Sequence, residues 1–193
     1  MGGSWVRQGW VIPGLAVLLA VVMGLSLSIG SMPIDWQELV VTLRTGGSSV
    51  SATVVFDLRL PRALSALVVG ASLSLAGVLM QVLLRNPLAD PYVLGTSGGA
   101  AAFALLVIFL GLPYQGIPLA AGIGSMLSMG LLFLLARGEG GWSSARLLLT
   151  GIVLASGWGA LISFILSITQ GAEIHSMLFW LMGDFRAASP GLT

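Results

Sequence analysis

The ionisable side chains of this 193-residue chain are few, and their positions limit the chemistry that the chain can carry. Only 8% of the residues are charged, whereas a water-soluble domain has about 25%. Arg59 and Arg62 directly precede a long apolar run, and an arginine fork can pair bidentately with a carboxylate. Proton transfer inside a membrane would instead require an acid or base that faces a cavity. All seven carboxylates lie outside the apolar runs: Asp35, Glu38, Asp57, Asp90, Glu139, Glu173 and Asp184. The apolar runs therefore offer no constellation of side chains for catalysis.

Metal binding and nucleophilic chemistry have little support in the sequence. The chain has no cysteine, which excludes disulfides, thiolate metal sites and cysteine nucleophiles. The single histidine, His175, has Glu173 two residues away and no second candidate ligand nearby, so we interpret it as an interfacial polar residue. The segment Thr96–Ala100 lacks the Gly-Lys-Ser/Thr ending of a phosphate loop. We expect no catalytic residue, no metal site and no bound cofactor, and a net charge of +1 gives no electrostatic case for nucleic acid.

Five uncharged apolar runs organise the chain, of which 56% is hydrophobic. Each run is about 20 residues long, which is enough for a helix to cross a hydrocarbon core of about 30 Å. The runs cover residues 11–29, 63–84, 93–110, 117–136 and 147–168. We interpret the first run as a retained span, because it is longer than the apolar part of a typical signal peptide and lacks a small-x-small cleavage site. The sequence predicts an all-α, polytopic membrane helical bundle with five transmembrane helices, as a single domain over residues 1–193.

Two shorter segments, at about residues 35–45 and 174–182, are predicted to be helices that lie along the membrane surface. Asp35 to Glu38 resembles a helix-start capping box, and apolar residues recur at helical spacing after Trp36. These helices would connect spans rather than cross the bilayer.

The fifth apolar run carries small residues at a spacing of four, namely Gly151, Ala155 and Gly159, and Ser156 interrupts its apolar face. Small residues let helix backbones approach closely in lipid, where no hydrophobic effect drives helices together. Two interpretations stay open: ordinary helix packing, or the wall of a translocation pathway with a moving seam.

The turn between the second and third runs is chemically specified. Pro87 and Pro91 each disfavour helix at the residue before them. Asp90 is suited to be an N-cap, with Pro91 as the first residue of the following helix. The positive-inside rule gives no orientation, since the eight basic residues divide evenly when the loops are assigned to alternate sides.

A longer combination of motifs resembles the FecCD family of ABC-importer permeases, which carry ferric siderophores, haem and cobalamin. It begins with Arg59-Leu-Pro-Arg62, continues through Gly70–Gly77 and Gln81, and ends with Arg85–Pro91 and Leu94–Ala100. Trp180–Gly183 also looks like the segment that follows the fifth span in that family. The residues that match the family motif turn are Arg85, Asn86, Pro87, Asp90, Pro91, Gly95, Gly98 and Gly99.

The resemblance implies a permease subunit of the inner (cytoplasmic) membrane with a cytoplasmic N-terminus. Its expected partners are a second permease subunit, cytoplasmic ATPase subunits that hydrolyse ATP, and an extracytoplasmic binding protein that delivers a metal chelate. It also implies that Arg59 and Arg62 dock carboxylates of the binding protein, and that the fifth span lines the pathway. Alternatively, the two arginines anchor the helix end by extending to lipid headgroups.

The chain departs from the family in length, because family permeases have about ten spans of about 20 residues each. Three hypotheses follow. The chain is a permease subunit or its N-terminal portion; it is a truncated, non-transporting scaffold or one half of a split permease; or it is an intramembrane enzyme. The last would need an ionisable group that the five runs lack.

Overall fold

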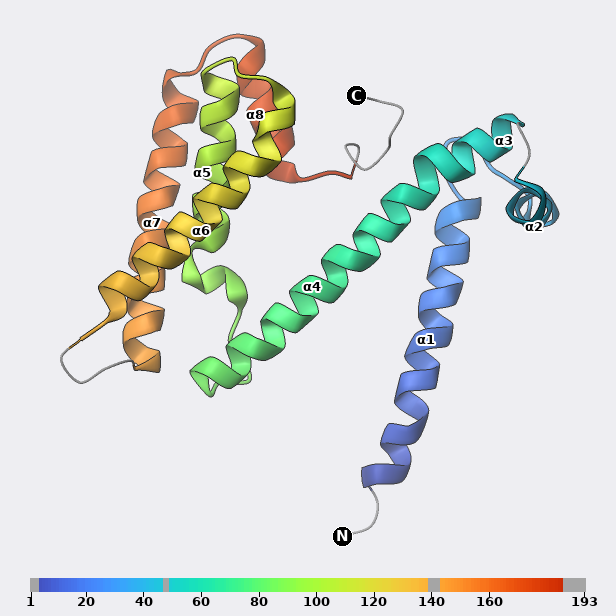
Figure 1. Ribbon diagram of the computed structural model, residues 1–193, viewed down its shortest axis with the longest axis horizontal. Helices are drawn as coiled ribbons and strands as arrows, with labels where there is room; N and C mark the ends of the chain where they lie inside the picture. Colours follow the sequence, from blue (N-terminus) through green and yellow to red (C-terminus); the bar gives the residue numbers. More distant parts are fainter. Residues whose placement is uncertain (1–3, 47–48, 139–142, 186–193) are drawn as a thin grey trace. The chain divides into compact units, whose positions relative to one another are not determined.

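The computed structural model describes residues 4–46, 49–138 and 143–185, and these residues form helices joined by short turns (Figure 1). The helices of the N-terminal part are α1 (Ser4–Ser28), α2 (Trp36–Thr45), α3 (Val50–Thr53), the π-helix η1 (Val54–Arg59) and α4 (Leu60–Leu84). The remaining helices are η2 (Pro91–Leu94), α5 (Thr96–Phe109), η3 (Tyr114–Gly116), α6 (Ile117–Ala136), α7 (Ser144–Ile168) and α8 (Ala172–Met182), where η2 and η3 are 3-10 helices. The predicted all-helical membrane bundle is confirmed.

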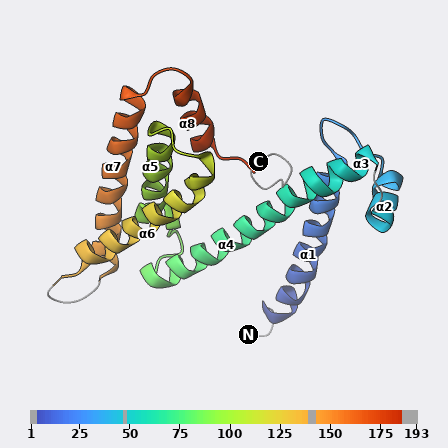
Figure 2. The ribbon, with the colours of Figure 1, turned by 45° about the horizontal axis from the view of Figure 1, so that its top comes forward.

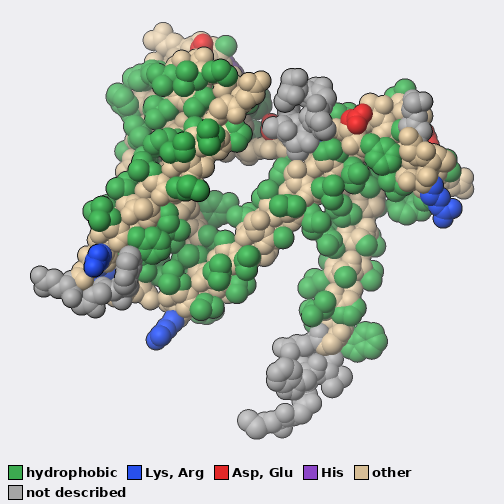
Figure 3. Space-filling model, viewed as in Figure 1, with side chains coloured by type: hydrophobic (Ala, Val, Ile, Leu, Met, Phe, Trp, Pro, Cys, Tyr) green, Lys and Arg blue, Asp and Glu red, His purple; other side chains and the backbone are tan. Residues whose placement is uncertain are grey.

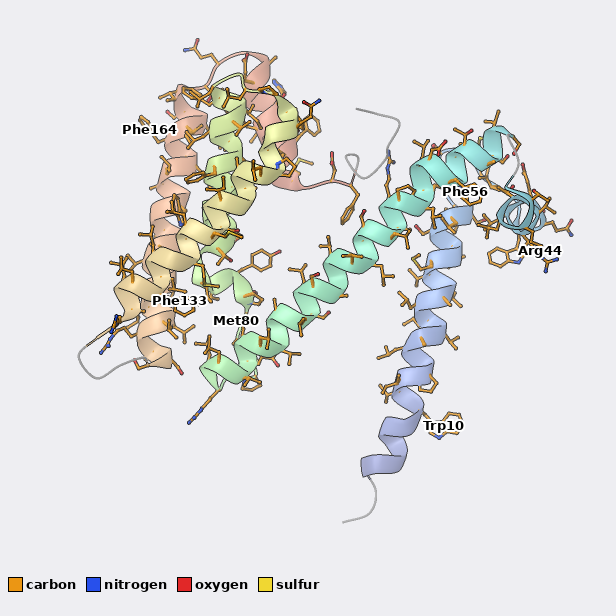
Figure 4. The ribbon with its side chains drawn as sticks, viewed as in Figure 1. Trp10, Arg44, Phe56, Met80, Phe133 and Phe164 are labelled. Carbon is orange, nitrogen blue, oxygen red and sulfur yellow. The ribbon has the colours of Figure 1, made fainter. Side chains whose placement is uncertain are left out.

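Among the described residues, four helical stretches are long and apolar enough to cross a membrane, as the sequence predicts for four of its five runs. They are Gly9–Ser28, Val50–Leu84, Tyr114–Ala136 and Ser144–Ile168. Hydrophobic side chains cover much of the visible surface, and charged side chains gather near helix ends (Figure 3). Trp10 of α1 and Phe164 of α7 project outward (Figure 4) and are 78% and 61% exposed, as expected for side chains that face lipid.

The third predicted span, residues 93–110, differs from the prediction. It begins as η2, turns at Gly95 and continues as α5, a helix of 14 residues. At 1.5 Å per residue α5 is about 21 Å long, which is shorter than a hydrocarbon core of about 30 Å. The break has a local cause, because Gly95 has a φ of +74°, in the left-handed region that interrupts a helix.

The helical stretch Val50–Leu84 is longer than a membrane needs. Its 35 residues extend about 52 Å, which exceeds a hydrocarbon core of about 30 Å. Its first turns contain η1, which ends just before Pro61. Proline has no N–H, and its ring would clash with the carbonyl of Asp57 in a regular α-helix, a conflict that the wider π-helical turn relieves.

The chain divides into two compact units, and α4 runs from the first into the second at Gly70. In the first unit the end of α1 packs with α2 and η1 around the core residues Leu27, Ile34, Leu39 and Val55. The predicted capping box of α2 does not form: the Asp35 side chain makes no cap hydrogen bond, and Glu38 accepts one from the Ser51 hydroxyl instead. α2 is therefore joined to α3 through its acidic side chain.

The second unit, residues 71–184, is built around α5. This helix packs against α6, α7 and α8, and its residues Ala102, Ala104 and Leu105 are fully buried (Figures 1 and 2). One hydrophobic cluster joins α5 and α6 to α7 and α8 through Ile165 and Met177. A second cluster joins the end of α4 to η2, α6 and α7. The unit thus holds both the motif turn and the small residues of the fifth predicted span.

Candidate functional site

The two arginines singled out by the sequence lie on one face of the helix that η1 and α4 form, three residues apart. Arg59 ends η1, and Arg62 is the third residue of α4. Both line a cleft of about 310 Å³, whose opposite wall is the last turn of α1 and residues 29–32. Both side chains are half-buried.

Arg59 is held by the C-terminal end of α1. Its Nη1 donates to the carbonyl oxygens of Leu27 (2.6 Å) and Ser28 (2.9 Å), and its Nη2 donates to the carbonyl oxygen of Met32. The last carbonyls of a helix have no partner within the helix, and they carry the negative end of its dipole. Arg59 therefore satisfies and neutralises the end of α1.

Arg62 has a different environment in the same cleft. Its Nε is buried and has no hydrogen-bond partner among the described residues. A buried donor without a partner is uncommon in folded proteins, so Arg62 differs from Arg59 in leaving this N–H unsatisfied.

The four residues predicted for a pathway or packing seam separate into two groups. A Cβ at Gly151 would lie 2.5 Å from the carbonyl oxygen of Val93, and a Cβ at Gly95 would lie 3.1 Å from the backbone nitrogen of Ala155. Gly151 and Ala155 are thus packed against η2 and the turn that follows it. Within the described chain a Cβ at Gly159 would meet no atom within 4 Å, and Ser156 is exposed with its hydroxyl bonded to the Ile152 carbonyl of the same helix (2.9 Å).

The exposed part of α7 continues beyond Ser156 as a face of small and polar residues. Since α-helical residues advance by 100°, positions 156, 160, 163 and 167 share one side of the helix. Ser163 and Ser167 were missed by the sequence analysis, although their spacing from Ser156 could have revealed them. The exposed members of this α7 small-residue face are Ser156, Gly159, Ala160, Ser163 and Ser167.

The motif turn is a sequence of local hydrogen bonds and close backbone approaches. Arg85 has a positive φ of 49°, and the Asn86 side chain accepts a hydrogen bond from the backbone of Leu88 (2.9 Å) after Pro87. The Asp90 carboxylate caps η2 by accepting from the backbone N–H of Tyr92 (2.8 Å), and Pro91 is the first residue of η2. The predicted cap is confirmed, although it starts a 3-10 helix rather than the span itself.

Gly95, Gly98 and Gly99 bring three helices together after this turn. A Cβ at Gly98 would lie 2.8 Å from the Cβ of Trp158, and a Cβ at Gly99 would collide with the Gly124 carbonyl of α6. These glycines permit close packing of α5 with α6 and α7, the role that the sequence favours over phosphate binding.

A buried polar chain reinforces this junction. The hydroxyl of Ser128, which is fully buried, donates to the Gly95 carbonyl (2.9 Å) and accepts from the Trp158 indole N–H (2.9 Å). Trp158 is the one tryptophan that falls inside a predicted span, and a buried indole N–H needs an acceptor. That position was the sequence signal for this network.

The titratable residues of α8 do not form a site with neighbouring ligands. Glu173 and His175 are both exposed. In the described ranges there is no group of three or more histidine, cysteine or acidic side chains that could hold a metal ion. Glu139 lies outside those ranges.

Comparison with known proteins assigns the family. The model of the FecCD transport family matches residues 18–191, which is most of the chain. The chain belongs to the FecCD transport family. The family inferred from the motifs at Arg59–Ala100 is therefore confirmed, and this FecCD chain is a multi-pass membrane protein.

Several FecCD relatives match almost the whole chain. It is 32% identical to the molybdate import system permease protein MolB of Haemophilus influenzae, over 93% of this chain and 55% of the relative. It is 35% identical to the vitamin B12 import system permease protein BtuC of Vibrio cholerae (96% and 54%), and 36% identical to the Fe(3+) dicitrate permease protein FecD of Escherichia coli (83% and 49%). A solved structure of a metal-chelate type ABC transporter in an inward-facing conformation matches with a TM-score of 0.79 and 31% identity, over 94% of this chain and 56% of that one.

The FecCD chain spans about half the length of the curated relatives that it matches. The matched half contains the arginine cleft, the motif turn and α7, so each of these features belongs to the part that the relatives share with this chain.

Proposed function

We propose that this chain serves as a permease subunit, or its N-terminal portion, in an ABC importer that moves a metal chelate across the cytoplasmic membrane by alternating access. The proposed substrate is a ferric siderophore, haem or a cobalamin-type chelate. The support comes from the family and from three relatives named as permease proteins for molybdate, vitamin B12 and Fe(3+) dicitrate. The subunit would supply a shaped passage, while a separate ATPase partner hydrolyses ATP.

The observation that carries the pathway proposal is the small-residue face of α7. A bulky polar chelate needs a wall with small side chains and weak hydrogen-bonding groups, because strong contacts would trap it. Ser156, Ser163 and Ser167 provide hydroxyls, and Gly159 and Ala160 leave space. A face directed only at lipid would gain nothing from three exposed serines, since lipid tails offer no hydrogen-bonding partners.

Ser156→Phe tests this pathway in the importer assembled with its ATPase and binding protein. A phenyl ring on the small-residue face should lower substrate uptake about tenfold, equivalent to about 1.4 kcal/mol of barrier. The melting temperature should stay unchanged, because Ser156 is exposed and bonds only within its own helix. Uptake of labelled chelate into proteoliposomes is the measurement.

Gly157→Phe is the matched control, because Gly157 follows Ser156 directly in the helix. A Cβ at Gly157 would meet no described atom within 4 Å, so there is room for the new side chain to leave the helix. Its side chain would point about 100° away from that of Ser156. The proposal that this face of α7 lines the pathway would be contradicted by an equal loss of uptake in both variants, or by normal uptake in Ser156→Phe.

The proposed orientation has a cytoplasmic N-terminus, so the start of the stretch Val50–Leu84 faces outward. The chain has no cysteine, and an introduced one is therefore a clean reporter. We expect a membrane-impermeant maleimide to label Thr45→Cys in intact cells. Leu88→Cys, at a position that is 87% exposed and follows the span, should react only after permeabilisation. The reverse pattern would contradict the orientation.

The proposed partners are a second permease subunit, cytoplasmic ATPase subunits and an extracytoplasmic substrate-binding protein. In this arrangement Arg59 and Arg62 stand at the outer end of the helix, where arginine–carboxylate bonds contribute about 1.5–3 kcal/mol each when shielded from water. A non-transporting scaffold would bind the same helices and yet give no substrate-dependent stimulation of the ATPase. Measuring that stimulation therefore separates the two functions.

A further inference from the structure

The short helix α2 is exposed on a side that carries large apolar side chains. Leu39 and Thr42 are buried against the rest of the first unit, whereas Trp36 and Leu43 are 58% and 46% exposed. We propose that the exposed apolar side of α2 lies in the bilayer surface, and that Arg44 binds the phosphate of an anionic phospholipid beside it. The inference goes beyond the proposed transport function, because it concerns a lipid and not the cargo.

The residues of α2 divide among an apolar side, a side with an amide and a cation, a side with a carboxylate and a hydroxyl, and the buried side. In that order they are Trp36, Val40 and Leu43; Gln37 and Arg44; Glu38 and Thr45; and Leu39 and Thr42. Because helical residues advance by 100°, the second, third and fourth sides lie about 90°, 180° and 270° around the helix from the first. Val41, which is 57% exposed between the second and third sides, is the exception to this pattern.

Trp36 shows which of these sides faces the bilayer. A Cβ at Gly24 of α1 would lie 3.1 Å from Cη2 and 3.3 Å from Cζ3 of the Trp36 ring. Gly24 precedes the end of α1 by one helical turn, about 6 Å, and α1 is apolar and long enough to cross a membrane. The apolar side of α2 is therefore directed back along α1 toward the lipid, and an interfacial depth is the usual one for a tryptophan.

Arg44 stands beside this apolar side, at the height where lipid meets water. It projects outward from α2 (Figure 4), and it has no hydrogen bond or ion pair with any residue that the structure describes. The carboxylate of Glu38 lies about 120° further around the helix and accepts a hydrogen bond from the Ser51 hydroxyl. The charge of Arg44 is thus not neutralised within its own helix.

The chemistry of a phospholipid phosphate fits this position. The apolar stem of an arginine can lie along the hydrocarbon surface while its guanidinium forks to two phosphate oxygens. A zwitterionic headgroup brings its own cation, whereas an anionic headgroup leaves its charge for the protein. The orientation of α2 therefore favours an anionic phospholipid over phosphatidylcholine at Arg44.

Spin labels at two introduced cysteines test where α2 lies, since the chain has no cysteine of its own. The full chain is placed in nanodiscs of phosphatidylcholine and phosphatidylglycerol. A nitroxide at Leu43→Cys should collide more with oxygen, which concentrates in lipid, than with a water-soluble nickel chelate. A nitroxide at Thr45→Cys, about 160° around the helix, should show the reverse. If both labels meet the nickel chelate equally, this side of α2 lies in water and the inference is wrong.

A fluorophore at Leu43→Cys then reports which lipid lies beside Arg44. Its quenching is compared between phosphatidylglycerol and phosphatidylcholine that carry the same nitroxide on an acyl chain. We expect about fivefold preference for phosphatidylglycerol, the effect of one basic residue at an anionic membrane surface. Arg44→Gln should abolish the preference at an unchanged melting temperature, and Arg44→Lys should retain most of it, because an ammonium also binds phosphate.

Arg85→Gln is the matched control, because it removes one exposed arginine from the motif turn and lowers the net charge equally. The preference at Leu43 should persist in this variant. The inference is overturned if Arg44→Gln keeps the preference, or if both variants lose it, since net charge would then be the cause. Inorganic phosphate added at constant ionic strength should leave the preference intact, and its loss would identify soluble phosphate as the occupant instead. These measurements need neither cargo nor ATPase, so their outcome is independent of the transport proposal.

Discussion

Gly124→Ala is expected to destabilise the protein by about 3 kcal/mol, at the upper end of the cost of overpacking a core. Gly124 of α6 and Gly99 of α5 face one another, and a Cβ on either residue would collide with the backbone carbonyl of the other. A clash with a flexible side chain can be relieved by rotation, whereas backbone atoms of two packed helices move only if the helices separate. α5 is the central helix of its unit, so this separation would disturb the hydrophobic cluster in which α5 and α6 meet α7 and α8.

The measurement is the melting temperature and the folded yield of purified protein in detergent or nanodiscs. Gly122→Ala provides the control, because Gly122 lies in the same helix and a Cβ there would meet no described atom within 4 Å. Alanine in an open helical position is expected to stabilise by about 0.5–1 kcal/mol relative to glycine. If both variants melt at the same temperature, the close crossing of α5 and α6 is not a determinant of stability.

Local sequence signals predicted the helix ends well. The fourth predicted span, residues 117–136, has the bounds of α6, and the predicted surface helix at 35–45 corresponds to α2 at Trp36–Thr45. Asp90 and Pro91 begin a helix as predicted. Each of these predictions depends on caps, prolines and apolar runs, which act over a few residues and can be read without tertiary structure.

Features that depend on packing between helices were predicted less well. Gly151 and Gly159 are small residues at a spacing that suggests one surface. Each step of four residues rotates about 40°, however, so the two positions are about 80° apart. One accordingly packs against η2, while the other is open. The sequence also could not place the guanidinium of Arg59, because its carbonyl partners lie about 30 residues earlier and are backbone atoms of no particular residue type.

Ser128→Ala is expected to cost about 2 kcal/mol, which is more than the average of about 0.6 kcal/mol for a hydrogen bond between membrane helices. The larger value follows from the position of the hydroxyl. Ser128 is fully buried and serves two groups, the Gly95 carbonyl and the Trp158 indole N–H. Its removal leaves the Trp158 indole N–H without an acceptor, which costs about 1–3 kcal/mol. It also takes one of two partners from the Gly95 carbonyl, which still accepts from the backbone N–H of Gly99 (3.2 Å).

Ser125→Ala is the control for this prediction, because the Ser125 hydroxyl bonds only the Gly122 carbonyl of its own helix (2.9 Å). Its removal should change the melting temperature little.

The hydrogen bonds lost in Trp158→Phe should cost less stability than those lost in Ser128→Ala, because Ser128 can still donate to Gly95. In the double variant the bond between Ser128 and Trp158 is lost only once, so the combined cost should fall below the sum of the two single costs by about 1 kcal/mol. Strict additivity would mean that the indole and the hydroxyl do not interact, and the three helices would then be held at this point by the packing of Gly95, Gly98 and Gly99 alone.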